Sequence, residues 1–313
     1  MTSNGIFSEG IGPGFVYMAF RAGAFIAEKT PLRVSDAVAR FGGMVAFLVA
    51  RRKRDVIGKN LARVVGEGAH LDGVVRAAFI SYAEYWLETF RLGRYSKADL
   101  LKMVTIDDEG RAALLGALQE GRGVVLATGH IGFYDLGVAW FGANGWPFTT
   151  VAEVLRPRAL FEWFAGIRTA RGMSVIPAKP GSEARQRLQE LVRGGEGVAI
   201  LSDRDISRRG IWGELFGEAT TFPAGPSLIV VNTEAPLLAG AIFKTGPSDF
   251  RVVFERVPYQ LCGDEQQDIR HVSGLIADRL EALIRRAPEQ WHLFSTNWPS
   301  DEPHLPSRGK ASA

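Results

Sequence analysis

The stretch from Gly121 to Gly137, GRGVVLATGHIGFYDLG, constrains the fold of this chain more than any other. Val124–Thr128 is a continuous apolar run with β-branched residues, bounded by glycines, which is typical of a buried strand. Gly132 leaves the backbone free to turn, and Asp135 opens an amphipathic helix that extends to about Ala143. This is the unit of an open α/β sheet, in which ligands collect beyond the carboxyl ends of the strands.

A histidine and an aspartate follow this strand closely. His130 comes directly after the strand and lies five residues before Asp135. On one regular helix the two side chains would point about 140° apart, so they can meet only if His130 lies on the turn and Asp135 in the first helical turn. We then expect Asp135 to hold one imidazole nitrogen, which leaves the other free to accept a proton. The alternative is a structural histidine followed by a helix-capping aspartate.

Beyond Thr105 the sequence alternates between apolar strand patterns and amphipathic helix patterns. Strands are expected at 124–128, 149–154, 174–177, 198–202, 237–244 and 250–257, and the last two are expected to form a hairpin. Helices are expected at 109–120, 135–143, 157–171, 182–193, from about 223, and at 264–286, with a long loop over 206–222. Strand and helix units joined by short loops favour a parallel sheet between helices. We therefore predict an α/β fold with a mostly parallel central sheet flanked by helices.

The N-terminal third is expected to form a helical layer, with helices over about 15–26, 35–50, 51–66 and 71–92. The second helix ends in the basic run RRKR, and an apolar helix followed by cations is typical of a segment that lies on an anionic leaflet. A core helix with a solvated basic end explains the pattern equally well. We predict three parts: a helical, membrane-facing segment over 1–104, an α/β core over 105–299 and a flexible tail over 300–313.

The charge and hydropathy of the chain limit its location and its partners. No signal-peptide pattern is found, and the apolar stretches at 14–27 and 41–50 are shorter than the roughly 20 residues that a membrane-spanning helix needs. We therefore expect peripheral attachment to the cytoplasmic side of the cell membrane. The 37 basic and 34 acidic residues leave a formal charge of +3. Clustered arginines with so small an excess suit phosphates or anionic lipid better than nucleic acid, so no nucleic-acid partner is expected.

The residue inventory disfavours several classes of chemistry. The single cysteine, Cys262, excludes an internal disulfide and a two-cysteine metal site. One histidine with scattered carboxylates lacks zinc-ligand spacing, so no metal is expected. The glycines of GRG precede a strand instead of following one, and no nucleotide-binding glycine loop is present. No G-x-S-x-G elbow is found, which disfavours a serine hydrolase.

Polar side chains cluster at the expected carboxyl ends of the strands. Because these ends lie along one edge of a parallel sheet, residues distant in sequence can share one crevice. The predicted site residues besides His130 and Asp135 are Glu153, Arg168, Asp203, Arg204, Arg208 and, for its backbone, Gly132. The arginines can bind phosphate groups bidentately. The alternatives are an ion pair between Glu153 and Arg156 and a solvated turn at Asp203–Asp205.

The sequence resembles a known enzyme family across about residues 50–299. The motif HIGFYD (130–135) looks like the signature of the glycerolipid and lipid A acyltransferases. More specific blocks follow in order: VAEVLRP (151–157), LFEWFAGIRTARGMSVIP (160–177), LSDRDISRRG (201–210), ELFGEATTFPAGP (214–226) and PEQWHLF (288–294). Together they resemble the bacterial lipid A lauroyltransferase-like enzymes, and within these the actinobacterial phosphatidylinositol mannoside acyltransferases.

The resemblance implies roles for individual residues. His130 matches the general base of the family, and Asp135 matches the carboxylate that orients it. Glu153 matches an active-site glutamate and Arg168 an active-site arginine. Asp203 stands where this branch can carry an important glutamate, so its side chain is one methylene shorter. Relatives usually have Asn-Trp where this chain has Phe-Tyr at 133–134, a departure that bears on the choice of acceptor.

The resemblance implies an acyl-CoA-dependent O-acyltransferase that transfers a palmitoyl-type chain to a mannose hydroxyl of a phosphatidylinositol mannoside. Its partners would be acyl-CoA, the membrane glycolipid and an anionic membrane surface, with acyl-CoA a co-substrate and no cofactor. The tetrahedral oxyanion would be bound by backbone N–H groups near Gly132 or at the start of the following helix. Three alternatives remain: a different acceptor such as a lipid A precursor, a thioesterase-like hydrolase, and a lipid-binding protein without catalytic activity.

Overall fold

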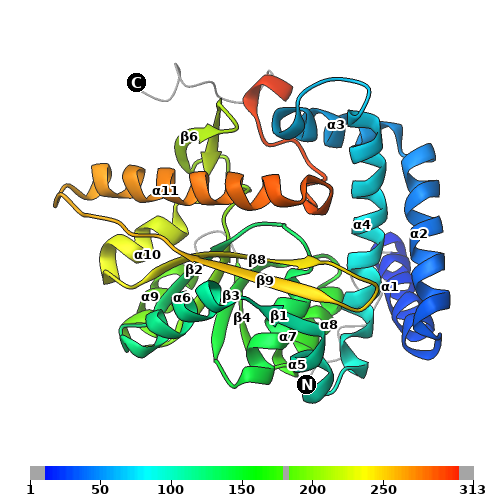
Figure 1. Ribbon diagram of the computed structural model, residues 1–313, viewed down its shortest axis with the longest axis horizontal. Coiled ribbons are helices and arrows are strands. Elements are labelled where there is room, and N and C mark those ends of the chain that lie inside the picture. The colour runs from blue at the N-terminus through cyan, green and yellow to red at the C-terminus, as the bar shows by residue number, and fades with distance from the viewer. Residues whose placement is uncertain (1–10, 179–182, 303–313) are drawn as a thin grey trace.

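The computed structural model describes residues 11–178 and 183–302 (Figure 1). At its centre is a seven-stranded sheet with the strand order β1-β9-β8-β2-β5-β3-β4. These strands are β1 (Val104–Ile106), β2 (Val124–Thr128), β3 (Phe148–Glu153), β4 (Met173–Ala178), β5 (Gly197–Leu201), β8 (Leu237–Lys244) and β9 (Phe250–Arg256). Neighbouring strands are parallel, except for the antiparallel pair β8 and β9. The predicted α/β fold is confirmed, and so is the hairpin.

Helices cover both faces of the sheet, because alternate side chains of each strand point to opposite faces. In β2, Val125 and Ala127 belong to one hydrophobic core, whereas Val124 and Leu126 belong to the other. The first face packs against α9 (Ala184–Arg193), α10 (Gly225–Thr233) and α11 (Glu265–Arg286), and the second against α5 (Lys97–Met103), α6 (Asp108–Gln119) and α7 (Tyr134–Asn144). Figure 1 shows α11 above the strands and α5 and α7 below them.

Four N-terminal helices form a layer at one end of the sheet (Figure 1). They are α1 (Ile11–Lys29), α2 (Leu32–Val49), α3 (Arg51–Val65) and α4 (Leu71–Arg91), as the sequence predicts. Helix α4 contributes Phe79 to one core and Tyr85 to the other, so helices and sheet share their cores across the predicted boundary at 104. Helix α2 approaches α4 closely at Gly43, where a Cβ atom would lie 2.6 Å from the Cα of Ile80.

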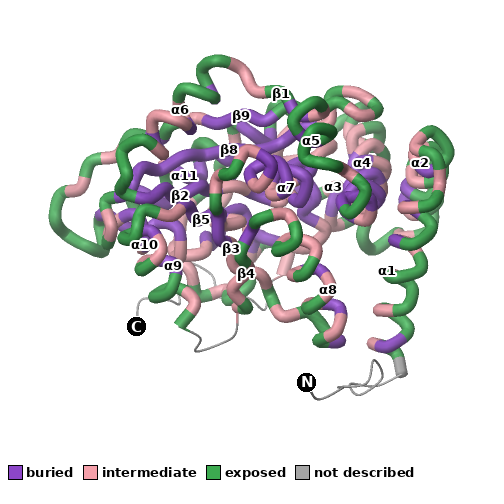
Figure 2. The backbone as a smooth tube through the Cα atoms, turned by 90° about the horizontal axis from the view of Figure 1, so that it is seen from below, coloured by how far each residue is buried: buried purple, intermediate pink, exposed green. Residues whose placement is uncertain are grey.

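Helices α1 and α2 keep much of their surface exposed (Figure 2). Helix α2 buries Ser35, Gly43 and Phe47. Its outward side carries Val34, Val38, Phe41, Val45 and Leu48, of which Phe41 is 71% exposed. This outward stripe has the three-and-four spacing of one helix face. None of the helices within the described residues combines the length and the hydropathy that crossing a bilayer requires.

The predicted loop over 206–222 contains a β-hairpin instead. Strands β6 (Ile211–Leu215) and β7 (Glu218–Phe222) pair antiparallel. Phe216 and Gly217 form the turn with φ angles of 55° and 75°, the conformation of a type I′ hairpin turn. The pattern is hard to detect because Gly213 and Glu214 interrupt the first strand and the second begins with Glu218. Packing against α11 stabilises the hairpin, although the strand propensity of its residues is weak.

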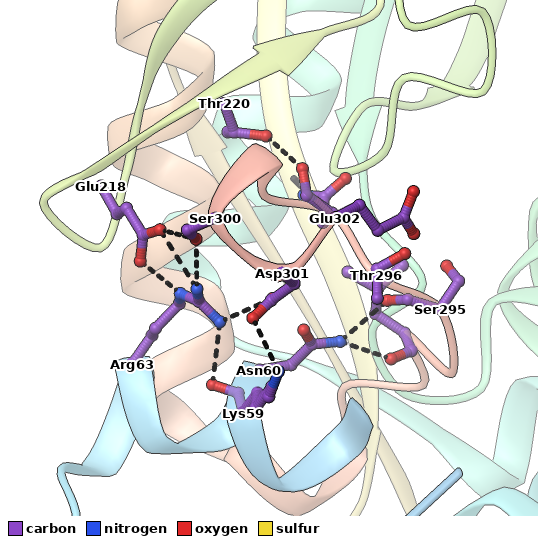
Figure 3. A network of polar contacts seen from close by, with 12 residues as sticks. Lys59, Asn60, Arg63, Glu218, Thr220, Ser295, Thr296, Ser300, Asp301 and Glu302 are labelled. Carbon is purple, nitrogen blue, oxygen red and sulfur yellow. Dashed lines mark hydrogen bonds and ion pairs between the residues drawn. The ribbon is translucent and has the colours of Figure 1, made fainter. Parts of the chain in front are cut away.

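The C-terminal aromatic segment is folded into the protein and is anchored by Arg63. The guanidinium of Arg63 binds Glu218 of β7, with a shortest distance of 2.6 Å, and Asp301 at 3.0 Å (Figure 3). It also lies 4.2 Å from the ring centre of Trp298. Trp298 itself is fully buried. Of the predicted tail over 300–313, residues 300–302 belong to this anchored segment, and 303–313 lie outside the described residues.

The same segment buries His292 among aromatic rings of α4. Its side chain is 5% exposed, and its ring centre lies 5.4 Å from those of Tyr82 and Tyr85. Nε2 is hydrogen-bonded to Ser81 Oγ at 2.9 Å, and Nδ1 has no partner among the described residues. Burial, together with the nearby charge of His130, lowers the pKa of His292 from 6.5 to about 3. The imidazole is therefore neutral in the folded protein near neutral pH.

His292 should make the folded protein sensitive to acid. In the unfolded chain His292 binds a proton below its ordinary pKa of 6.5, whereas in the folded chain it binds one only below about pH 3. Stability is therefore lost as pH falls, by about 2 kcal/mol from this residue between pH 7 and pH 5. In denaturant unfolding at the two pH values, His292→Gln should lose less stability than the wild type by that amount. His271→Gln, at an exposed position, is the matched control. A wild-type pH dependence in His292→Gln would contradict the expectation.

Candidate active site

The register of β2 and β5 brings His130 and Asp203 together. The two strands are parallel neighbours, and Thr128 is paired with Leu201. His130 and Asp203 each lie two residues beyond that pair, at the same edge of the sheet. The His130 Nδ1–H group donates a hydrogen bond to Asp203 Oδ1 at 2.9 Å. The side chain of Asp203 is fully buried, whereas that of His130 is 24% exposed.

Asp203 is held by donors from two segments. Its Oδ2 atom accepts hydrogen bonds from the backbone N–H of His130 at 3.0 Å and from Trp291 Nε1 at 2.9 Å. Burial alone would raise the pKa of this carboxyl, but the charge and hydrogen bonds of His130 and the bond from Trp291 lower it below its usual value. Asp203 is therefore a carboxylate at neutral pH. It fixes His130 in the tautomer that carries hydrogen on Nδ1, which leaves Nε2 able to accept a proton.

The predicted contact between His130 and Asp135 is wrong. Asp135 lies in the first turn of α7, and its carboxylate accepts hydrogen bonds from Tyr85 Oη of α4 and from Arg168 Nε of α8 (Arg158–Thr169), both at 2.6 Å. His130 instead lies before the turn at Gly132 and faces the end of β5. The five-residue spacing therefore sends the two side chains to different partners.

The cluster of Asp135, Arg168 and Tyr85 connects three helices. Burial opposes the charge of Arg168, but the adjacent Asp135 carboxylate raises the arginine pKa overall. Burial and the same carboxylate raise the pKa of Tyr85 well above its usual value. Tyr85 thus remains a neutral donor, and Asp135 and Arg168 form an ion pair across α7 and α8. The described contacts give this cluster a structural role at the base of the His130 loop.

Gly132 forms the turn after His130, and its own N–H group is already used in a backbone hydrogen bond. Its φ angle is +64°, and a Cβ atom would lie 1.8 Å from the carbonyl oxygen of Ile242. Its N–H donates to Gln290, and the next N–H, of Phe133, donates to Ile242. Of the two predicted sources of oxyanion donors, the amides at Gly132 and Phe133 are therefore occupied, and the start of the following helix is left. The amides of Tyr134 and Asp135, at the start of α7, have no acceptor among the described residues.

The other predicted residues have different surroundings. Glu153 is exposed at the end of β3, and neither it nor Arg156 forms an ion pair within the described residues, so the alternative pair is not found. Arg204 is half-buried and forms no hydrogen bond or ion pair with any residue that the structure describes. The guanidinium of Arg208 donates to the carbonyl groups of Thr296 and Asn297. Arg208 therefore supports the C-terminal segment and is not a free phosphate ligand.

Three residues of the site were not identified from the sequence. Tyr134 places its ring edge-on to the imidazole of His130, with ring centres 5.9 Å apart. Trp291 binds the side chain of Asp203, and Asn297 Nδ2 donates to its carbonyl oxygen at 3.1 Å. The PEQWHLF block is the only sequence signal for Trp291, and it does not specify a partner. Within the described residues, no group of three His, Cys, Asp or Glu is placed to hold a metal ion.

Comparison with known proteins agrees with this architecture. The family described as bacterial lipid A biosynthesis acyltransferase matches residues 14–300. A phosphatidylinositol mannoside acyltransferase from Mycolicibacterium smegmatis is 31% identical over 288 residues, which cover 91% of each chain. One from Mycobacterium tuberculosis is 33% identical over 247 residues, 78% of this chain and 76% of the relative. The chain therefore belongs to the bacterial lipid A biosynthesis acyltransferase family.

Proposed function

We propose that this acyltransferase moves a long, palmitoyl-type acyl chain from acyl-CoA to a mannose hydroxyl of a phosphatidylinositol mannoside. The observation that carries the chemical part is the hydrogen bond between His130 and the buried, ionised Asp203. It leaves one imidazole nitrogen available in a partly exposed ring. The names of the two mycobacterial relatives support the glycolipid acceptor.

In the proposed reaction, His130 Nε2 takes the proton of the sugar hydroxyl as its oxygen attacks the thioester carbonyl. The C–O bond forms, the tetrahedral intermediate collapses, and the C–S bond breaks. The departing thiolate then takes the proton from the imidazolium, which yields the ester and free CoA. General-base assistance of this kind contributes roughly 10²–10⁴-fold to the rate. The amides of Tyr134 and Asp135, at the positive end of the α7 dipole, are the proposed oxyanion donors.

The proposed substrate contacts use charged side chains that are not already occupied by protein partners within the described residues. Glu153 is the proposed hydrogen-bond acceptor for sugar hydroxyls, since its carboxylate is exposed and unpaired within the described residues. Arg204 is the proposed phosphate ligand, in preference to Arg208, whose guanidinium binds backbone carbonyls. Arg168 uses Nε for Asp135, which leaves its terminal nitrogens as further candidates.

Removing the base should abolish the transfer. With labelled palmitoyl-CoA and phosphatidylinositol mannosides, followed by mass spectrometry, His130→Ala should lower kcat by at least about a hundredfold, and Asp203→Asn by a similar factor. The wild type incubated without glycolipid distinguishes the alternatives. CoA release at the full rate would favour a hydrolase, and acyl-CoA binding without turnover would favour a lipid-binding protein. Near-normal transfer by His130→Ala would refute the mechanism.

Asp135 should matter more for stability than for the chemical step. Asp135→Asn leaves the half-buried Arg168 without its counter-charge, which should cost up to about 3 kcal/mol of unfolding free energy. At a temperature where the variant stays folded, its kcat should remain within about tenfold of the wild type, because His130 keeps its own carboxylate. The measurements are denaturant unfolding and steady-state kinetics, with Asp203→Asn as the comparison. Equal losses of kcat in the two variants would restore a catalytic role to Asp135.

We further propose that the protein attaches peripherally to the cytoplasmic side of the membrane through α1 and α2. The outward stripe of α2 exposes large apolar side chains, and the exposed cations Arg51, Arg52 and Lys53 begin α3 at its end. Lys53 also donates to the carbonyl of Phe294. An apolar helix face beside cations suits an anionic lipid surface, because burial of apolar area and charge attraction add together. Such attachment would bring the site to its lipid substrates.

The α2 stripe can be tested by vesicle flotation. The double variant Val38→Ser/Phe41→Ser should bind phosphatidylglycerol-containing vesicles at least about tenfold more weakly, because each apolar residue contributes about 1.5–3 kcal/mol when it is buried. The wild type should bind less at high salt and less to phosphatidylcholine alone. Leu101→Ser, at an exposed apolar position of α5, is the control and should bind like the wild type. Unchanged flotation of the double variant would rule out this attachment.

A further inference from the structure

Trp291 belongs to the C-terminal segment, outside the central sheet, and its side chain contacts Asp203 of the His130–Asp203 pair. The geometry points to Trp291 as a positioning residue, whose indole N–H fixes the orientation of the Asp203 carboxylate and through it the imidazole of His130. This inference rests on the proposed function, since it assigns Trp291 to the reaction for which His130 is the base. Trp291 itself acts only through Asp203 and needs no contact with substrate.

The hydrogen bonds around Asp203 divide its two oxygens between different tasks. Within the part of the chain that the structure describes, Oδ1 accepts one bond, from His130 Nδ1 at 2.9 Å. Oδ2 accepts the bonds from Trp291 Nε1, at 2.9 Å, and from the amide of His130, at 3.0 Å. The terminal torsion of an aspartate is broad and has no sharp minimum of its own. Donors on Oδ2 therefore decide where Oδ1 lies, and Oδ1 decides the direction of the imidazole.

The backbone of Trp291 is joined directly to the loop that carries the base. Ile131 and Trp291 form an antiparallel bridge, in which the amide of Gly132 donates to Gln290 at 2.6 Å and the amide of His292 donates to His130 at 2.7 Å. The indole and the imidazole thus belong to two segments in register with each other. A displacement of one segment moves the other, so the distance from Trp291 to Asp203 is well defined.

The indole is also held rigidly by its surroundings. Trp291 is 2% exposed, and its ring centre lies 5.8 Å from that of Phe216 and 6.2 Å from that of Trp298. In addition, Asn297 Nδ2 donates to the carbonyl oxygen of Asp203, which fixes the backbone from the same segment. If Asp203 loses the hydrogen bond from Trp291, its buried carboxylate is less well solvated. The carboxylate then attracts a protonated His130 imidazole more strongly.

Few titratable groups of the described residues lie beside the pair, which makes its pH response interpretable. Tyr134 of α7 lies edge-on to His130. His292, with its pKa lowered to about 3, stays neutral over the range of an activity assay. Asp205 accepts bonds from Ser207 and from the amide of Gly210, and Arg204 is the adjacent cation. None of these side chains is changed by a substitution at Trp291.

The chain offers a matched pair of tryptophans for the test. Trp291 and Trp298 are both buried in the C-terminal segment, but the indole N–H of Trp298 has no acceptor among the described residues. Trp291→Phe removes the donor to Asp203, whereas Trp298→Phe removes an N–H group of the same kind that has no partner in the described part of the chain. With palmitoyl-CoA and phosphatidylinositol mannosides, Trp291→Phe should lower kcat roughly 10- to 100-fold, with KM within about twofold. The acidic limb of the pH–activity profile of Trp291→Phe should move to higher pH. Trp298→Phe should match the wild type in both kcat and pH profile.

A second measurement needs no variant. In ¹⁵N-labelled wild-type protein, the indole N–H resonance of Trp291 should shift with pH at the midpoint of the activity profile, and that of Trp298 should not. A kcat and pH midpoint in Trp291→Phe equal to those of Trp298→Phe, or an unresponsive Trp291 resonance, would overturn the positioning role. His130→Ala separates the two proposals. If His130→Ala is inactive, the kinetic and resonance results test the role of Trp291 alone. If His130→Ala is active, His130 is not the base, and the role of Trp291 is refuted with it.

Discussion

The buried carboxylate of Asp203 is the interaction on which the site depends. An ionised group away from water is stable only when donors replace its hydration. Here those donors are the ring and amide of His130 and the indole of Trp291. They come from the loop after β2 and from the C-terminal segment, so neither segment can leave its place without exposing an uncompensated charge. The same contacts that stabilise Asp203 orient His130, which links folding of the segment to chemistry at the sheet edge.

Two carboxylates near one histidine have separate tasks. Asp203 orients the imidazole, whereas Asp135 joins α7 to α4 and α8 through Tyr85 and Arg168. Both are nearly free of solvent, and each is balanced by its own cation or donors. Because the cluster of Asp135, Arg168 and Tyr85 fixes the start of α7, it also fixes the two N-terminal amides that lack an acceptor among the described residues. The scaffold residue Asp135 and the proposed base His130 thus lie five residues apart in the chain, and their side chains contact different partners.

The N-terminal helices show a similar division of one element between two surroundings. Helix α2 uses Gly43 and Phe47 to pack on α4, and it leaves Val38 and Phe41 on the outside. A helix that is apolar on both sides can be explained by burial on one side and lipid on the other. The basic start of α3 lies at the end of that helix, and the proposed attachment to an anionic lipid surface rests on this arrangement.

The sequence alone determined the local elements: the strand over 124–128, the turn at Gly132, the helix that follows, and the α/β class, because apolar periodicity and glycine placement are local properties. It also placed His130 and Asp203 at strand ends. It could not determine that β5 lies beside β2, since strand order is set by the packing of segments whose key residues are 73 positions apart. The β6–β7 hairpin and the burial of Trp291 were decided in the same way. Only the tertiary structure could choose Asp203 over Asp135, because a hydrogen bond follows the distance between atoms in space, and separation along the chain is a poor guide to it.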